Sequence, residues 1–357
     1  MNKEKQILRL NFKAFDNKWM LDYAYQHIGG NFSPVEWKNN LLYFIIDWFS
    51  GKETLTVTTS GSTGQPKKTE LSKKAMEAGA KTTIDFFGLK PGSKILICLP
   101  AQYIATKMML VRGITGKLDV FAIPPSLFPV STWTPPLDFA AFTPAQMSKL
   151  LQKEEGVDFV NGIKTIILGG SPVSSNLEEK IQLLKSSVWH TYGMTETMSH
   201  VALRKLNGVE KSSFFHPLPG VKITLNNKQC ITITAPHLNL FNLQTNDLGE
   251  INPDGGFIIK GRRDNIINSG GVKLIPEEIE NRISRYMEFP FYIGALPDEI
   301  LGEKMVMFVE KEITKPANEE KKKIEKLLHN HLNGIEIPKE IIFQKKFKRT
   351  ESGKIIR

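Results

Sequence analysis

The stretch KILICLPAQYIATKMMLVRGITGKLDVFAI, residues 94–123, decides the fold class of this chain. It begins with the apolar run Lys94–Leu99, continues with apolar residues at helical spacing over Tyr103–Gly113, and closes on a second apolar run, Leu118–Ile123. Short apolar runs bounded by Pro or Gly are typical of buried strands. The stretch therefore predicts a strand, a helix and a second strand, the unit from which parallel sheets are built.

The same alternation continues downstream. We predict a helix, a strand, a helix and a strand at Pro144–Leu151, Thr165–Leu168, Ser174–Leu184 and Val188–Thr191. The predicted fold class is α/β, with a large N-terminal domain of mostly parallel sheets flanked by helices.

Polar clusters follow directly after two of the predicted strands. They are Gly169-Gly170-Ser171-Pro172 and Tyr192-Gly193-Met194-Thr195-Glu196. Ligands of open α/β sheets bind beyond the carboxyl ends of the strands. We therefore expect a ligand site at these clusters.

A run of hydroxyl and glycine residues lies upstream of the sheet, Thr58-Thr59-Ser60-Gly61-Ser62-Thr63-Gly64-Gln65-Pro66-Lys67-Lys68. Glycines allow the backbone to approach an anion, hydroxyls donate to phosphate oxygens, and a lysine adds positive charge. The spacing is not that of the P-loop, because Pro66 stands five positions after Gly61. On its own, such a run is more often a surface loop or linker than a phosphate site.

The C-terminal third differs in texture. From Val221 onward, short β-rich runs predict a smaller antiparallel region that completes the large domain. A helix opened by Pro276-Glu277-Glu278, strands at 291–295 and 304–310, and a helix over 318–332 predict a small α+β module. We therefore place a large domain over residues 1–263 and a small C-terminal lid domain over residues 264–357.

The composition is that of an ordinary globular protein, with 41% hydrophobic and 24% charged residues among 357. The net charge of +10 would suit nucleic acid, an anionic membrane or acidic small molecules. Because the lysines are scattered and no nucleic-acid-binding motif accompanies them, we predict no nucleic-acid partner. A basic nucleic-acid-binding protein is an alternative that rests on charge alone.

Cysteine usage and hydropathy indicate the compartment. Cys98 and Cys230 each lie in an apolar run, which predicts buried thiols in a reducing environment. The N-terminal residues lack a signal core, and no stretch approaches the ~20 apolar residues of a membrane span. We expect a cytoplasmic protein without stable membrane insertion, either a monomer or a homodimer.

Five charged residues could together hold a nucleoside triphosphate. Asp247 could bind a ribose diol, Glu196 a Mg²⁺ ion, and Lys67 with Lys354 the negative charge of the phosphates, and Arg262 would complete the site. Each of them alone is equally typical of a solvated surface residue.

The order of five motifs resembles that of the adenylate-forming enzymes, which include acyl-CoA synthetases, luciferases and peptide-synthetase adenylation domains. The matching segments are Thr59–Lys67, Tyr192–Glu196, Thr245–Asp247, Gly261–Asp264 and Lys348–Lys354. One departure is Asn246, which stands where the family commonly has glycine. The match runs from Thr58 to Lys354, so it covers most of the chain.

This resemblance implies a two-step reaction that uses ATP, Mg²⁺ and CoA. A carboxylate first attacks the α-phosphate of ATP to give an acyl-adenylate, and the thiol of CoA then displaces AMP. The resemblance implies that Lys354 bridges the carboxylate and the α-phosphate, that Thr195 contacts the phosphate, and that Glu196 holds Mg²⁺. The protein's work would be positional and electrostatic rather than covalent.

The resemblance also assigns binding roles. It implies phosphate contacts from Thr59, Ser60, Gly61, Ser62, Thr63, Gly64 and Lys67. It implies adenosine contacts from Gly169, Gly170, Tyr192, Gly193, Asp247 and Arg262. The small domain would rotate about Asp264, and Ser269, Gly270 and Gly271 would then shape the CoA tunnel.

Within the family, the chain looks most like the compact o-succinylbenzoate:CoA ligases of menaquinone synthesis. The likeness rests on the early phosphate loop and on the strings Gln102–Ala105 and Met194–His200. An acid with two carboxylates needs a cation or donors for the one that does not react, and Lys107, Arg112, His200 and Arg204 are the candidates. Another acyl- or aryl-CoA ligase, and a nucleotide-binding protein without catalysis, are the alternatives.

Overall fold

The computed structural model describes residues 7–11, 13–16, 22, 36–59, 67–132, 135–312, 317–349 and 355–357. The chain divides into two compact units. The first comprises Met1–Val173, Lys180–Lys222 and Thr234–Phe241, and the second comprises Ser174–Glu179, Ile223–Ile233 and Asn242–Arg357.

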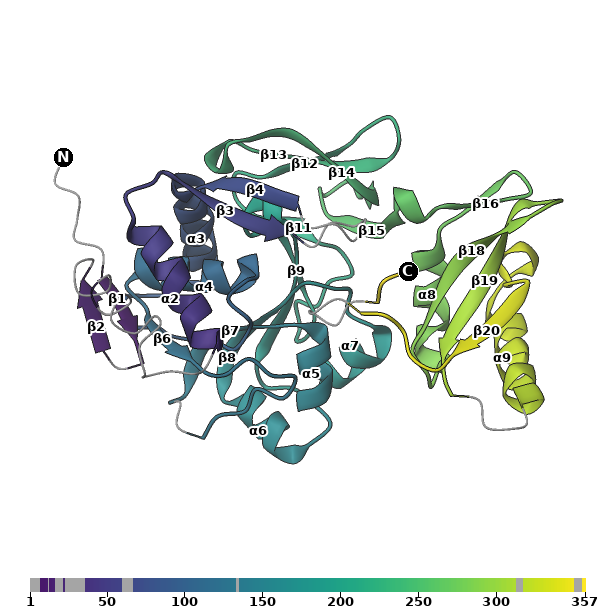
Figure 1. Cartoon of the computed structure of the whole chain (residues 1–357), viewed down its shortest axis with the longest axis horizontal. Coiled ribbons are helices and arrows are strands. Elements are labelled where there is room, and N and C mark those ends of the chain that lie inside the picture. Colours follow the sequence, from purple (N-terminus) through teal and green to yellow (C-terminus); the bar gives the residue numbers. More distant parts are fainter. Residues whose placement is uncertain are drawn as a thin grey trace. The chain divides into compact units, whose positions relative to one another are not determined.

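A nine-stranded sheet forms the centre of the first unit (Figure 1), in the order β11-β10-β9-β8-β7-β5-β6-β1-β2. The strands are β1 (Ile7–Leu10), β2 (Lys13–Asp16), β5 (Lys94–Ile97), β6 (Asp119–Ala122), β7 (Leu137–Phe142), β8 (Ile163–Leu168), β9 (Ser187–Gly193), β10 (His200–Lys205) and β11 (His216–Pro217). Pairing is parallel from β1 through β9 and antiparallel toward β2, β10 and β11. The predicted α/β class is confirmed.

The helices that follow are α2 (Glu36–Phe49), α3 (Lys73–Phe87), α4 (Ile104–Gly116), α5 (Pro144–Leu150), α6 (Glu154–Asn161) and α7 (Ser175–Ile181). Helix α6 was not predicted, and most of α7 belongs to the second unit. The Ser72 hydroxyl caps α3 by accepting from the Ala75 N–H, and Gly88 ends the helix at a φ of 63°. Helix α4 packs against α3 and against β1, β5 and β6, so the stretch 94–123 lies at the centre of the fold.

The second unit contains two sheets. One has the order β12-β13-β14-β15, from β12 (Lys222–Leu225), β13 (Cys230–Ala235), β14 (Leu240–Ile251) and β15 (Phe257–Arg262). The other has the order β17-β16-β19-β18 with β20 beside β19, from β16 (Ile267–Ser269), β17 (Val272–Leu274), β18 (Phe291–Asp298), β19 (Gly302–Glu310) and β20 (Glu340–Gln344). Helices α8 (Pro276–Ile283) and α9 (Ala317–His331) close a buried core whose members lie between Ile267 and Ile341.

Several strands were not predicted, among them β2, β7, β10, β11, β16 and β17. Three more are informative. A short strand β4 (Lys67–Ser72) pairs with β3 (Thr54–Thr59), β14 is twelve residues long, and β20 is parallel to β19. Strand β14 escapes prediction because most of it is polar or exposed, so its sequence lacks an apolar repeat. The predicted helix at Ser174–Leu184 is also shorter, since α7 ends at Ile181.

Two further expectations concern burial. Cys98 and Cys230 are buried free thiols, as predicted. No helix within the described ranges combines the length and apolar character needed to cross a bilayer.

Candidate functional site

The predicted phosphate loop begins and ends on a β-hairpin. Strands β3 and β4 pair antiparallel with Thr59 opposite Lys67, so the two ends of the loop lie side by side. Ser60, Gly61, Ser62, Thr63 and Gly64 lie outside the described residues, as do the side chains of Thr59 and Lys67. Lys354 lies outside them as well, and its role stays a prediction.

Gly169 and Gly170 follow β8 at the carboxyl edge of the sheet. A Cβ atom on Gly169 would lie 2.6 Å from the Thr191 hydroxyl oxygen, which donates to the Leu168 carbonyl at 2.9 Å. Gly170 has a φ of 88°, a conformation that favours glycine. Position 169 therefore needs glycine because of its neighbour Thr191, and position 170 favours glycine because of its backbone conformation. Two residues without side chains would also leave room for a flat base to approach the backbone.

Tyr192 and Gly193 end the neighbouring strand β9, which pairs in parallel with β8. Parallel strands end at the same edge, so the two polar clusters lie close together. The Tyr192 ring is buried and packs 6.1 Å from the Phe215 ring, measured between centroids. Sheet geometry thus assembles the predicted adenine contacts of the first unit.

Thr195 and Glu196 lie in the short 3₁₀ helix η1 (Thr195–Thr197) between β9 and β10. The buried Thr197 hydroxyl accepts from the Met194 N–H at 2.9 Å and contacts the Ser199 carbonyl at 2.6 Å, which fixes the turn. Met198 has a φ of 59°, so the chain reverses sharply after η1. The turn holds Thr195 and Glu196 half-exposed at the end of the sheet.

The Glu196 carboxylate suits one ligand of a magnesium ion. It forms no hydrogen bond or ion pair with another described residue, so its charge is available. Across the described ranges, no three His, Cys, Asp or Glu side chains gather into a ready-made metal cluster. Mg²⁺ is commonly held by one or two carboxylates together with substrate phosphates, so a single half-exposed carboxylate fits the ion.

Two of the four candidate acid-binding residues lie together. The Arg112 guanidinium is 2% exposed and donates to the Ser199 hydroxyl at 2.5 Å and to the Thr83 hydroxyl at 3.3 Å. His200 contacts the same two hydroxyls: its Nε2 lies 3.3 Å from the Thr83 hydroxyl and its Nδ1 lies 3.4 Å from the Ser199 hydroxyl. Sequence reasoning missed Thr83, which lies in α3 and carries no motif; Ser199 belongs to the string used for the resemblance but was given no role.

Electrostatics make Arg112 unusual. Burial lowers its pKa to about 9, and no carboxylate of a described residue pairs with it. Burial and the Arg112 charge hold the pKa of His200 well below its usual value, so that ring is neutral. A buried cation without a counter-ion is costly, and an anion from outside would offset that cost.

The other two candidates lie elsewhere. Arg204 packs 5.7 Å from the Phe215 ring and faces His190 across the β9–β10 pairing. Lys107 borders a pocket of about 170 Å³ between α2, β3 and the start of α4, where burial lowers its pKa and Asp47 opposes this. Among the described contacts, Arg112 and His200 thus share two hydroxyl partners, whereas Arg204 contacts Phe215 and Lys107 borders a separate pocket.

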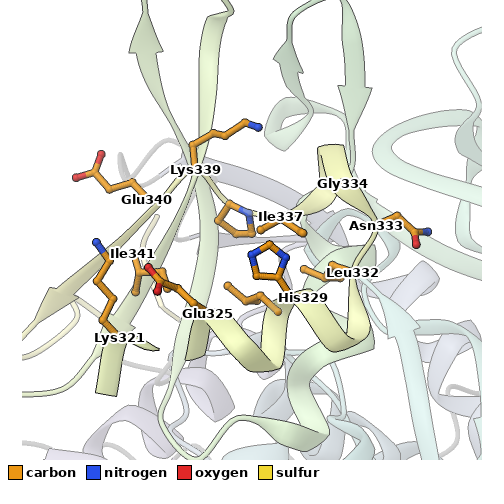
Figure 2. A pocket seen from close by; sticks show the side chains of 12 residues that line it. Lys321, Glu325, His329, Leu332, Asn333, Gly334, Ile337, Lys339, Glu340 and Ile341 are labelled. Carbon is orange, nitrogen blue, oxygen red and sulfur yellow. The ribbon is translucent and has the colours of Figure 1, made fainter. Parts of the chain in front are cut away.

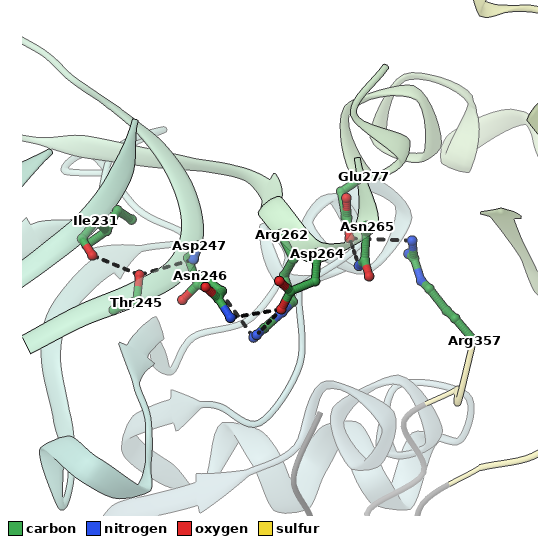
Figure 3. Close-up of polar contacts among 9 residues, drawn as sticks. All are labelled: Ile231, Thr245, Asn246, Asp247, Arg262, Asp264, Asn265, Glu277 and Arg357. Carbon is green, nitrogen blue, oxygen red and sulfur yellow. Dashed lines mark hydrogen bonds and ion pairs between the residues drawn. The ribbon is translucent and has the colours of Figure 1, made fainter. Parts of the chain in front are cut away.

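Asp247 and Arg262 are opposite one another on β14 and β15 of the second unit (Figure 3), with Arg262 Nη1 3.5 Å from Asp247 Oδ1. Arg262 Nη2 also lies 3.6 Å from Asp264 Oδ2, which accepts from Asn246 Nδ2 at 2.8 Å. The predicted ribose pair and the predicted hinge carboxylate thus form one connected group. Asn246 supplies a bond to the hinge that glycine could not.

Ser269, Gly270 and Gly271 form the end of the β16–β17 hairpin. Gly270 and Gly271 have φ values of 57° and 82°, the pattern of a two-residue turn that favours glycine. Ser269 is buried, and Gly270 N–H donates to the Leu301 carbonyl at 2.9 Å. The glycines are therefore required by the backbone, and a role in a CoA tunnel stays a prediction.

A hollow of about 660 Å³ lies between α9 and β20 (Figure 2). Its lining includes Lys321, Glu325, His329 and Lys339 and contains none of the predicted site residues.

Comparison with known proteins gives a family match. The model of the AMP-binding enzyme family matches residues 54–231. An acyl-CoA synthetase (AMP-forming)/AMP-acid ligase II-like protein from Dyadobacter fermentans is 33% identical, with a TM-score of 0.61 over 90% of this chain and 93% of that one.

Two further comparisons concern ligases named for one acid. A 2-succinylbenzoate–CoA ligase from Lactococcus lactis is 26% identical over 87% of this chain and 71% of its own length. The structure of o-succinylbenzoate coenzyme A synthetase from Bacillus subtilis, in complex with ATP and magnesium ion, has a TM-score of 0.69. It is 20% identical over 85% of this chain and 68% of that one, a likeness of fold.

Proposed function

Because the chain belongs to the AMP-binding enzyme family, the adenylate-forming ligases, we propose that it converts a carboxylic acid, ATP and CoA into an acyl-CoA, AMP and pyrophosphate. The proposed acid is o-succinylbenzoate, and the proposed product is the o-succinylbenzoyl-CoA of menaquinone synthesis. The relatives named 2-succinylbenzoate–CoA ligase support this substrate.

One observation carries the choice of a dicarboxylic acid. The buried Arg112 guanidinium has no described anionic partner and is bonded to Ser199, three residues after Glu196. In o-succinylbenzoate one carboxylate reacts and the other stays ionised. We assign the unreacting carboxylate to Arg112, with the neutral His200 and the Ser199 hydroxyl as further partners.

In the first half-reaction, a carboxylate oxygen bonds to the α-phosphorus of ATP while the bond to pyrophosphate breaks. Gly169, Gly170, Tyr192 and Gly193 would frame the adenine, and Asp247 and Arg262 would hold the ribose. Thr59, Ser60, Gly61, Ser62, Thr63, Gly64 and Lys67 would hold the outer phosphates. Thr195 and Lys354 would donate to the α-phosphate, where Lys354 also contacts the attacking carboxylate.

Glu196 would hold Mg²⁺, which neutralises phosphate charge when bound. In the second half-reaction, the sulfur of CoA bonds to the acyl carbon and the bond to AMP breaks. We propose that residues 264–357 rotate about Asp264 between the two steps, so that Ser269, Gly270 and Gly271 border the path of CoA.

The test is ATP–pyrophosphate exchange that depends on the added acid, across o-succinylbenzoate, benzoates and fatty acids. We expect exchange to be fastest with o-succinylbenzoate. Exchange with another acid but not with o-succinylbenzoate would mark a different acyl- or aryl-CoA ligase. Nucleotide binding without exchange for any acid would contradict the enzymatic proposal.

A further inference from the structure

Arg357 makes a concentrated set of contacts within the second unit. Its Nη2 donates to Glu280 Oε2 at 2.5 Å, and its Nη1 lies 3.4 Å from Glu277 Oε1 and 3.5 Å from the Ile293 carbonyl. The guanidinium also lies 6.0 Å from the centre of the Tyr292 ring. The arginine is thus held by α8 on one side and β18 on the other.

The carboxylates that receive Arg357 are themselves fixed. Glu280 is 17% exposed and accepts from the Ile293 N–H at 2.7 Å, and burial raises its pKa to about 7 against the opposing effect of Arg357. Glu277 Oε1 accepts from Asn265 Nδ2 at 2.5 Å, next to the predicted hinge Asp264 (Figure 3). The two carboxylates that bind Arg357 are therefore held in place by other hydrogen bonds as well.

The residues on the other side of Lys354 are anchored too. Arg349 forms an ion pair with Glu310, which also accepts from the Phe347 N–H at 2.7 Å. Arg349 pairs antiparallel with Ile355, and the Ile356 N–H donates to the Lys348 carbonyl at 2.9 Å. The described residues before and after segment 350–354 are thus bonded to each other and to the body of the unit.

We propose that Arg357, through Glu280 and Glu277, is a positioning residue that sets where Lys354 stands during adenylation. This rests on the proposed function, in which Lys354 serves the first half-reaction. Lys354 is three residues from Arg357, so the backbone between them spans at most about 10 Å. Loss of the Arg357 contacts would release the residues after Lys354 from α8 and β18, while the bonds of Ile355 and Ile356 to Arg349 and Lys348 would remain.

The experiment compares the two half-reactions in Arg357→Gln. We expect ATP–pyrophosphate exchange to fall about 10- to 100-fold at unchanged KM for ATP, because misplacement by about 1 Å can cost this much. Thioester formation from supplied o-succinylbenzoyl-AMP should stay within about threefold, since Lys354 is not needed there. Arg357→Lys should restore part of the exchange, and Lys354→Ala marks complete loss.

Arg282→Gln is the matched control. Arg282 lies on the same helix, α8, and forms a paired contact with Glu336, and among the described residues it has no contact with 347–349 or 355–357. We expect this variant to lose a comparable ion pair without changing the ratio of the two half-reactions. A second variant, Glu280→Gln, serves if Arg357→Gln folds poorly. It keeps an acceptor for the Ile293 N–H but loses the charge that pairs with Arg357, so it should show the same selective loss of ATP–pyrophosphate exchange.

A second measurement does not depend on activity. Amide hydrogen exchange at Ile356 should be at least about tenfold faster in Arg357→Gln than in the parent protein, and unchanged in Arg282→Gln. Unchanged protection, retained ATP–pyrophosphate exchange, or equal loss of both half-reactions would overturn the role of Arg357. Absence of exchange in the parent protein with every acid would instead contradict the proposed function, while the protection data would still decide the anchor.

Discussion

Arg112 is the residue on which the choice of acid depends. The apolar spacing of residues 103–113 predicts that Arg112 lies in a helix, but it does not predict its partners or its burial. Thr83 and Ser199, which accept its hydrogen bonds, are 29 and 87 residues away in sequence. The guanidinium is thus oriented by neutral hydroxyls, and we propose that its charge pairs with a carboxylate of the acid.

We predict that Arg112→Lys raises KM for o-succinylbenzoate by about 10- to 100-fold, because an ammonium cannot form the two parallel bonds of a guanidinium. KM for an acid with one carboxylate should change by less than about threefold, since that acid makes no such contact. Exchange assays with both acids measure this. An equal rise for both acids would place Arg112 in a structural role.

At the scale of elements, the turn from β9 through η1 to β10 packs its backbone closely. The order of residues along the chain predicts the motif but not this close packing. A Cβ atom on Gly193 would lie 2.5 Å from the Ser199 carbonyl oxygen and 2.7 Å from His200 Cα. Both atoms are backbone, so they cannot yield without breaking the β9–β10 pairing. Glycine here fixes the approach of two strands and thereby the position of Glu196.

We predict that Gly193→Ala lowers the free energy of unfolding by about 1–3 kcal/mol, the usual range for overpacking. The urea midpoint measures this change. Gly334→Ala is the matched control, because no neighbouring atom lies within 4 Å of its added methyl group. Its effect should stay within about 0.5 kcal/mol. Equal midpoints for the two variants would show that β10 adjusts to the methyl group.

At the scale of the whole molecule, two buried histidines connect stability to pH. Burial, with the Arg204 charge, lowers the pKa of His190 to about 3, although its contact with the Ser171 carbonyl opposes this. Burial, with the Arg112 charge, also holds the pKa of His200 well below its usual value. Both rings stay neutral in the folded chain while the unfolded chain takes up protons below about pH 6.5.

Their contribution to stability is therefore complete above about pH 6.5 and is lost as the pH falls, toward about 3 for His190. We predict that, between pH 7.5 and pH 5, the free energy of unfolding falls by about 2 kcal/mol more in the parent protein than in either His190→Gln or His200→Gln. Urea unfolding at the two pH values measures this difference. The exposed His329→Gln is the control, and identical pH dependence in all four proteins would contradict the prediction.

Sequence by itself determined the fold class and the order of the motifs. Buried parallel strands are covered on both faces, so they leave continuous apolar runs that any reader of residues 94–123 can find. Loops that bind phosphate need glycines and hydroxyls at adjacent positions, so their signal is also local.

Tertiary structure alone decided which charges meet. Arg357 and Glu280 are 77 residues apart, and only the packing of α8 against β18 brings their partners together. The separation of Lys107 and Arg204 from the Arg112 cluster has the same origin. Patterns along a chain record how each segment is buried, whereas contacts between side chains depend on how distant segments pack.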